Sequence, residues 1–335
     1  MKIRHAILTL ATLLLVGGVA MWWHLELIPQ VRAVAAERGT AVEIVYATGG
    51  VEPVRWAKVA SLIRDRIVDI CDCEGRKVAK GDVLVRLDDR EVQAQMRELK
   101  AREVFLQREM SRVSELISRN IATTQAYERA AMDLQQVQAQ IMVQLEKIND
   151  YTIMSPMEGV VLRRDGEIGE IAEVGQILFR VGVPLPLQVV AEVNEEDIPR
   201  VALEQKVLFR TDAFAGKLLE GKVREITPMG DVVAKTYRIK VALPDDTPLK
   251  PGMSVEANIV TKERAGALLV PVDALQGAAV FVIDGSKARR RDVKIGIRGT
   301  RTVEVLDGLQ DSERVAAPAP TGLKDGARVR FAETP

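Results

Sequence analysis

A gapless internal repeat constrains this chain more than any other feature of its sequence. The segment GRKVAKGDVLVRL at residues 75–87 aligns with GEIAEVGQILFRV at 169–181, at a constant offset of 94 residues (175 − 81 = 94). Glycine pairs at such spacing indicate turns that require a positive φ, and each copy continues into a short apolar run typical of a β-strand. We interpret the copies as two halves of one small two-fold β-sandwich. A chance similarity between two β-hairpins is the alternative.

The stretch between the two copies, from 89 to 150, predicts a helical hairpin. It contains no proline or glycine, and its apolar residues recur at steps of three and four, as in a coiled coil. Asn120 suits the end of one helix, and Thr123 or Thr124 suits the N-cap of the next. Two helices of about 28 residues would form an antiparallel pair roughly 40 Å long. A pair of helices within a globular bundle is the alternative. The predicted seam is Val92, Met96, Leu99, Leu106, Met110, Val113 and Ile117, interrupted at Glu103, then Tyr127, Ala130, Leu134, Val137, Ile141, Leu145 and Ile148.

The N-terminus predicts a membrane anchor. Lys2 and Arg4 precede an uncharged apolar run from Ala6 to Trp23, which at 1.5 Å per residue spans roughly 27 Å. The preceding positive charges favour a cytoplasmic N-terminus, and we expect a single-pass protein of the inner membrane with the bulk of the chain in the periplasm. A signal peptide cleaved at Ala33–Ala35 is the alternative.

Later segments alternate with the period of β-strands. Apolar and polar residues alternate along 236–243 and 252–260, which indicates one buried and one solvated face per strand and, with the intervening turns, a small barrel. We also expect a hairpin around Asp284–Gly285. A strand near Val42–Ala47 is expected to pair with these late strands.

Composition argues against several classes of protein. The 335 residues include 47 basic and 47 acidic side chains, so the chain lacks the positive charge of a bulk nucleic-acid binder. The two histidines, His5 and His24, both border the predicted anchor, and no phosphate-binding P-loop motif occurs. We therefore predict no catalytic residue, no cofactor, no metal site and no nucleic-acid partner.

The sulfur-containing residues are interpreted as structural. Cys71 and Cys73 have no further Cys or nearby His to complete a thiolate metal site, and alternate residues of a strand share a face but rarely bond to each other. We interpret this pair as incidental packing, open to oxidation in an oxidising compartment. Met132, Met142 and Met154 are interpreted as seam or core residues.

Several segments together resemble a known family. They are EGRKVAKGDVLVRLDDRE at 74–91, SPMEGVVLRRDGEIGEIAEVGQILFRV at 155–181, VNEEDIPRV at 193–201, LKPGMSVEANIV at 249–260, ALLVPVDAL at 267–275 and VEVLDGLQDSERVA at 303–316. With the helical stretch between the first two, they resemble the HlyD-type membrane fusion proteins, the periplasmic adaptor subunits of bacterial export pumps. The resemblance covers nearly all of the chain beyond the predicted anchor.

The resemblance implies a fold that is mainly β with an α-helical coiled-coil hairpin, in an elongated multidomain chain. A lipoyl-like β-sandwich split by the hairpin would be followed by a β-barrel and a membrane-proximal β domain. The implied domains are 1–25 (cytoplasmic N-terminus and anchor), 26–56 (linker and N-terminal strand), 57–88 (first lipoyl-like half), 89–150 (hairpin), 151–183 (second lipoyl-like half), 184–265 (barrel) and 266–335 (membrane-proximal domain).

The resemblance also implies a function without catalysis. The chain would link an inner-membrane transporter of the ABC or RND type to a TolC-like outer-membrane channel for export of small molecules, as a homo-oligomer with six copies in a ring. An adaptor of a type I-like protein or peptide secretion system and an envelope scaffold or carrier domain without an export role are the alternatives.

One set of site residues follows from the family's hairpin tip. There an Arg, a Leu four residues later and a Ser seven residues after the Leu are implicated in contact with the channel. Arg112, Leu116 and Thr123 stand at these spacings, with Thr in place of Ser. The alternative is that Arg112 is merely solvated and Leu116 belongs to the seam.

Overall fold

The computed structural model describes residues 29–320 and 322–331. The predicted anchor, Ala6–Trp23, lies outside these residues. Among the helices described, none combines the length and the apolar character needed to cross a bilayer. The contacts between residues divide the chain into two compact units, one built from 51–188 with 244–252 and the other from the remaining segments.

The unit of residues 51–188 contains two four-stranded sheets related by the internal repeat. A shift of 94 residues carries β4 onto β8, β5 onto β9, β6 onto β10 and β7 onto β11, so each sheet is the image of the other. One sheet has the order β10 (Ile171–Ala172), β5 (Asp65–Ile70), β7 (Val83–Leu87), β8 (Thr152–Met154); the other has the order β4 (Trp56–Ala60), β11 (Ile177–Gly182), β9 (Gly159–Arg164), β6 (Lys77–Val78).

The turns of each half are hydrogen-bonded to the other half. The Gly75 amide donates to the Val161 carbonyl at 2.9 Å, and its repeat partner Gly169 donates to the Ile67 carbonyl at 2.8 Å. Gly75 and Gly169 have φ of 76° and 95°, which confirms the left-handed turns predicted from the repeat. One buried core draws on both halves, including Ile67, Leu84, Val85, Leu87, Val161, Leu178, Phe179 and Val181.

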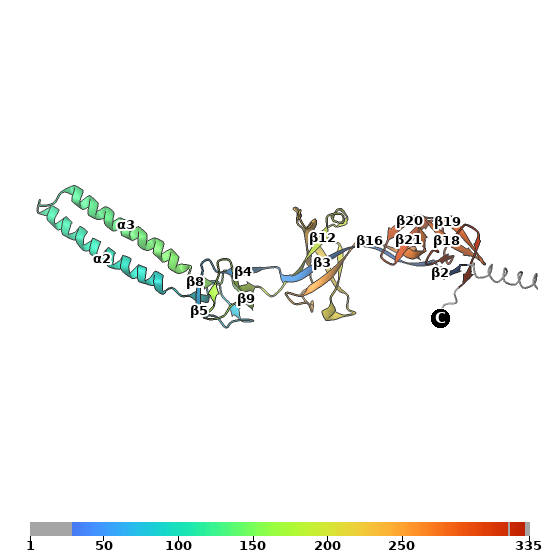
Figure 1. The fold of residues 1–335 in the computed structure, drawn as a ribbon, viewed down its shortest axis with the longest axis horizontal. Coiled ribbons are helices and arrows are strands. Elements are labelled where there is room, and N and C mark those ends of the chain that lie inside the picture. Colours follow the sequence, from blue (N-terminus) through green and yellow to red (C-terminus); the bar gives the residue numbers. More distant parts are fainter. Residues whose placement is uncertain (1–28, 321, 332–335) are drawn as a thin grey trace, which may run out of the picture. The chain divides into compact units, whose positions relative to one another are not determined.

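Two α-helices stand between the halves, α2 (Arg90–Ser118) and α3 (Thr124–Asn149), and they pack along each other (Figure 1). The buried residues of α3 are Ala130, Leu134, Val137, Ile141 and Gln144. The prediction of Leu145 as a seam residue is therefore wrong, because its side chain is 39% exposed while Gln144 is buried. The seam of α3 steps by three and then four residues, from Ile141 to Gln144 to Ile148. A search for apolar residues alone passes over the polar Gln144 and selects the neighbouring Leu145 instead.

Gln144 is accommodated in the seam by hydrogen bonds. Its side-chain amide donates to the Val92 carbonyl at 3.0 Å and to the Gln95 side chain at 3.1 Å. A buried amide that meets partners avoids the desolvation cost of an unpaired polar group. In α2 the half-buried Glu103 likewise occupies a seam position and accepts a hydrogen bond from Gln138 at 3.2 Å.

The interpretation of three methionines as seam or core residues is also wrong. Met132, Met142 and Met154 are 63%, 60% and 48% exposed. Met132 and Met142 fall between the buried positions of α3, and Met154 lies on the outward face at the end of β8. Their hydrophobicity suggested burial, but their place in the period decides their exposure.

Cys71 and Cys73 form a disulfide, which corrects the expectation that they merely pack. That expectation placed both residues in a strand, whereas β5 ends at Ile70 and the cysteines lie in the loop that follows. The turn of the chain brings their Cα atoms to 5.3 Å, within the range that a disulfide spans.

The other unit contains a closed six-stranded barrel. The strand order is β13 (Lys206–Arg210), β14 (Leu219–Ile226), β15 (Thr236–Ala242), β12 (Leu187–Asn194), β3 (Glu37–Pro53) and β16 (Ser254–Pro271), and pairing of β13 with β16 closes the ring. Ile239, Val241, Ala257 and Ile259 are fully buried and alternate with more exposed residues, which confirms the predicted strand faces. The strand expected near Val42–Ala47 lies within β3 and pairs with β16.

The same unit continues into a second β region. Its eight-stranded sheet extends from β16 through β21 (Thr302–Asp307) to β20 (Lys294–Arg298). The hairpin expected around Asp284–Gly285 joins β18 (Ala279–Asp284) to β19 (Lys287–Asp292), with Asp284 opposite Lys287. The remaining strands are β2 (Ala33–Ala35), β22 (Arg314–Ala316), β23 (Ala327–Arg328) and β17 (Leu275–Gln276) beside that hairpin, and β1 (Gln30–Val31) in parallel with β24 (Arg330–Phe331).

Candidate partner-binding surfaces

The turn between α2 and α3 is held by backbone hydrogen bonds that end the first helix. Asn120 adopts a left-handed φ of 59°, its amide donates to the Ile117 carbonyl at 2.8 Å, and the Ile121 amide donates to the Leu116 carbonyl at 2.9 Å. This pair of bonds around a left-handed residue is the Schellman motif. Asparagine is one of the few residues besides glycine that adopt this conformation readily, which explains why the helix ends here.

Thr123 begins the returning helix, as the sequence predicts. It is the N-cap of α3, and its hydroxyl accepts a hydrogen bond from the Ala126 amide at 3.2 Å. The hydroxyl thereby satisfies one of the amides that a helix leaves without a partner in its first turn. Thr123 is also exposed, beside the turn.

Arg112 lies on α2, two helical turns before Asn120. Its side chain is 68% exposed and forms an ion pair with Glu109, one turn earlier on the same helix. Hydrogen bonding to the Glu109 carboxylate, and then its charge, raise the pKa of Arg112 above the usual value. The guanidinium group is therefore a permanent positive charge at the surface of α2.

The structure brings two of the three predicted tip residues to the turn itself. The half-buried Leu116 contributes its carbonyl to the Schellman bond, and Thr123 caps the next helix. Arg112 stands four residues before Leu116, a spacing that places two side chains on the same face of a helix. The turn thus presents a hydroxyl and an apolar side chain, with a cation on the helix behind them.

Ile121 is an exposed apolar residue of the turn that the sequence analysis did not identify. Its side chain is 70% exposed, directly after the left-handed Asn120. The signal was present, because an apolar residue is common at the second position after a helix that ends in this motif. Ile121 enlarges the apolar surface available at the tip.

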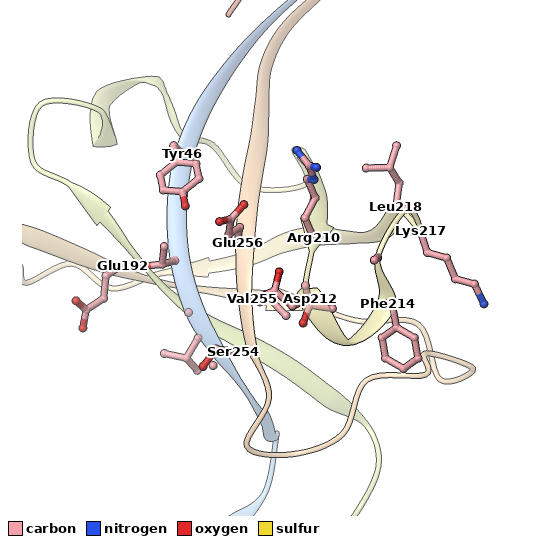
Figure 2. Close-up of a pocket in the computed structure, with 17 residues that line it drawn as sticks. Tyr46, Glu192, Arg210, Asp212, Phe214, Lys217, Leu218, Ser254, Val255 and Glu256 are labelled. Carbon is pink, nitrogen blue, oxygen red and sulfur yellow. The ribbon is translucent and has the colours of Figure 1, made fainter.

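A groove of about 1040 Å³ on the outer face of the barrel was also not predicted. Its floor carries Tyr46 from β3 with Ser254 and Glu256 from β16, and the loop after β13, which includes Asp212 and Phe214, forms a wall (Figure 2). Residues on the outward faces of neighbouring strands line the groove. In the sequence they can be recognised only as the positions that alternate with buried apolar residues. Their grouping depends on which strands become neighbours.

The groove combines charged groups with two aromatic rings. Desolvation raises the pKa of Tyr46, and the neighbouring Glu256 carboxylate, which accepts a hydrogen bond from its hydroxyl, raises it further. Arg210 from β13 adds a cation to the same lining. The arrangement offers hydrogen-bonding and apolar contacts to another molecule and contains no histidine or cysteine. Within the described parts of the chain, no cluster of three or more His, Cys, Asp or Glu side chains is arranged to hold a metal ion.

Comparison with known proteins places the barrel in a family of related domains. Residues 187–263 match the family model described as CusB-like, beta-barrel domain. The chain is 25% identical to the pyoverdine export membrane fusion protein PvdR of Pseudomonas aeruginosa, over 86% of this chain and 90% of that protein. It is 23% identical to the macrolide export protein MacA of Escherichia coli O157:H7, over 91% of this chain and 94% of that protein.

Solved structures share the fold. The crystal structure of MacA from Actinobacillus actinomycetemcomitans matches 86% of this chain and 99% of its own with a TM-score of 0.53 at 21% identity. A MacA–MexA chimera that carries the α-hairpin domain of Pseudomonas aeruginosa MexA matches 84% of this chain and 99% of its own with a TM-score of 0.61 at 21% identity.

Proposed function

We propose that this chain is a membrane fusion protein that acts as the periplasmic adaptor of an export pump, linking an inner-membrane transporter to a TolC-like outer-membrane channel for export of small molecules. Relatives named for pyoverdine export and macrolide export support this role, since both names refer to export of a small molecule, and a further relative is named as a multidrug resistance protein. We propose no catalytic residue and no cofactor for it. The observation that carries the proposal is the pair of helices inserted between two interlocked halves of one β unit.

The proposed domains follow from this role. We assign the two repeat halves, 57–88 and 151–183, to a lipoyl-like domain, 89–150 to a coiled-coil hairpin, 184–265 to the barrel and 266–335 to a membrane-proximal domain. The barrel and membrane-proximal domains would bind the transporter, of ABC or RND type, and residues 1–25 would include the anchor in the inner membrane. Several copies, six in the family's arrangement, would surround one export duct.

The hairpin tip is the proposed contact with the channel. Helices of 29 and 26 residues reach about 40 Å from the β unit that carries them. Arg112 supplies an exposed cation, and Leu116 with Thr123 lies at the turn where a partner helix would pack. Arginine and apolar anchors commonly dominate such contacts.

Co-purification of the channel tests the tip assignment. We expect Arg112→Asp to lower the recovery of a TolC-like channel by about tenfold, the equivalent of ~1.4 kcal/mol of binding energy. Arg108→Asp is the matched control, because it makes the same charge change at an exposed position of the same helix, one turn further from the tip. Both variants should keep the wild-type helical signal in circular dichroism.

Two results would contradict the assignment. Equal recovery with Arg112→Asp and wild type would remove Arg112 from the contact. Equal loss with both variants would show that recovery of the channel depends on the positive charge of α2 in general and not on the residues near the tip.

A further inference from the structure

The groove on the outer face of the barrel is lined by charged side chains that the fold leaves without ionic partners. Its lining includes Glu192, Arg210, Asp212, Lys217 and Glu256. None of the five forms an ion pair with another described residue, although other outward residues of β13, β14 and β15 do form ion pairs. Single unpaired charges are ordinary on a surface, but five around one hollow provide complementary contacts for a charged ligand.

The charges are separated by sign across the groove. Strands β12, β3, β16 and β13 are neighbours in that order around the barrel. Glu192 comes from β12 and Glu256 from β16, whereas Arg210 ends β13 and Lys217 lies in the loop that follows (Figure 2). The groove therefore has an acidic side, made by the two glutamates, and a basic side, on which Arg210 and Lys217 outnumber Asp212.

Gly50, on the floor of the groove, is a glycine that its own surroundings do not require. Its φ lies outside the left-handed region, and a Cβ atom added to it would meet nothing within 4 Å. At the adjacent Gly49, in contrast, a Cβ would lie 2.3 Å from the Val190 carbonyl oxygen. A glycine inside a strand weakens the strand and often marks a site where a ligand approaches the backbone closely. Gly50 thus leaves open space in the floor of the groove.

The loop between β13 and β14 adds apolar surface on the basic side. Eight residues, 211–218, connect the two strands, more than the two to five of common hairpin loops. The loop forms a wall of the groove and contributes the half-buried Phe214 and the 64% exposed Leu218. The Lys217 amide donates to the Phe214 carbonyl at 3.1 Å, which helps to hold the loop in this shape. An apolar group next to a bound anion would find contacts here.

The dimensions of the groove define the length of a ligand that reaches both sides. Neighbouring strands are about 4.8 Å apart, so the three steps from β12 to β13 span roughly 14 Å. An extended peptide covers about 3.5 Å per residue, so four residues cover the same span. The groove volume of about 1040 Å³ is at the upper end for small-molecule sites.

We propose that the groove binds a small zwitterionic molecule of about the length of a tetrapeptide. Its ammonium end lies at Glu192 and Glu256, its body passes over Gly50, and its carboxylate end meets Arg210 and Lys217. A zwitterion is selected because a ligand with only one charge would leave the opposite side of the groove without a partner. This site goes beyond the proposed function, which assigns no ligand to the chain.

Isothermal titration calorimetry of the full-length chain in detergent tests the ligand class. The probe is a tetrapeptide of alanine, alanine, leucine and phenylalanine, in that order, with free ends. Its matched controls are the same peptide acetylated at the amino end, amidated at the carboxyl end, or blocked at both. We expect the free peptide to bind with a dissociation constant below about 1 mM, and each single block to weaken binding by about tenfold.

Charge-neutral variants test the orientation of the ligand. Glu192→Gln should remove the preference for a free amino end and keep the preference for a free carboxyl end. Lys217→Gln should have the opposite effect, so that each variant is coupled to one end of the peptide. Glu263→Gln is the matched control, because it neutralises an exposed carboxylate of β16 outside the groove. It should keep both preferences.

Substitution of Gly50 tests the location of the site. Gly50→Leu should fill the floor of the groove and weaken binding of the free peptide by about tenfold or more, whereas Gly50→Ala should have a smaller effect. Both variants should fold, because neither the φ of Gly50 nor its neighbours oppose a side chain. Thermal unfolding followed by circular dichroism checks this.

Three results would overturn the proposal. If the wild-type chain bound the free and the doubly blocked peptide equally, or bound neither at about 10 mM, the ligand would not be a zwitterion of this kind. Wild-type affinity in folded Gly50→Leu would place the site elsewhere. If the free peptide failed to bind and folded Gly50→Leu lost a co-purifying transporter, the groove would be a docking surface for that protein.

Discussion

Individual residues determine where the chain turns between its two helices. Asn120 adopts the left-handed conformation that ends α2, and the Thr123 hydroxyl caps α3 through the Ala126 amide. The helix end at Asn120 and the cap at Thr123 do not depend on distant parts of the chain, because their hydrogen bonds join residues close together in the sequence. The Thr123 side chain, which we propose contacts the channel, therefore also has a local structural role.

Substitution of Thr123 separates these two roles. Thr123→Ala removes the capping oxygen and should destabilise α3 by about 1 kcal/mol, whereas Thr123→Ser keeps the oxygen and should cost much less. Hydrogen exchange of the first-turn amides of α3 measures the effect, and Thr124→Ala serves as the control at the adjacent position. Equal protection in Thr123→Ala and wild type would contradict the capping role.

At the scale of elements, the helical pair follows a strict heptad seam in which polar residues are included. Gln144 is buried and donates to the Val92 carbonyl, while the apolar Leu145 beside it is exposed. A polar residue at a seam position typically favours one register of the two helices at some cost in stability. The position of a residue in the period therefore matters more for its burial than its hydrophobicity does.

A pair of substitutions in α3 tests this seam. Leu134 is 8% exposed and Met132, two residues before it, is 63% exposed. We expect Leu134→Ala to lower the free energy of unfolding of the hairpin by about 2–5 kcal/mol, and Met132→Ala to change it by less than about 0.5 kcal/mol. Urea denaturation followed by helical circular dichroism distinguishes them. Similar losses for both would mean that the seam is assigned wrongly.

At the scale of the whole molecule, the internal repeat makes one core from two distant stretches of chain. Leu84 and Leu178 are repeat partners, both essentially inaccessible to solvent, and they belong to the same buried cluster. The turns of each half are bonded to strands of the other half. Neither half can complete its core alone, which accounts for the return of the chain after α3.

Because the two halves share one core, we expect substitutions at repeat-related positions to destabilise the β unit to a similar extent. Leu84→Ala and Leu178→Ala should each destabilise the β unit by about 2–5 kcal/mol. Because one core is shared, each variant should lower hydrogen-exchange protection in both halves to a similar extent. Loss of protection confined to the mutated half would show that the halves unfold separately.

Much of the fold is predictable from the sequence because the signals are local or periodic. The paired glycines, the cap at Thr123 and the strand alternation near Ile239 each depend on a few neighbouring residues. The tip residues Arg112 and Leu116, in contrast, came from the family resemblance, and their role stays a prediction. The barrel groove around Tyr46 and Glu256 gave no signal in the sequence, because it depends on which strands become neighbours.

Residues close together in the chain specify the repeat, the helical stretch between its copies and the periods of the later strands, since backbone preference and burial act over short distances along the chain. Long-range packing determines that Cys71 and Cys73 bond and that Tyr46 and Glu256 line one groove. Each of these outcomes depends on how the chain bends and on which distant segments it meets, and no local pattern encodes that.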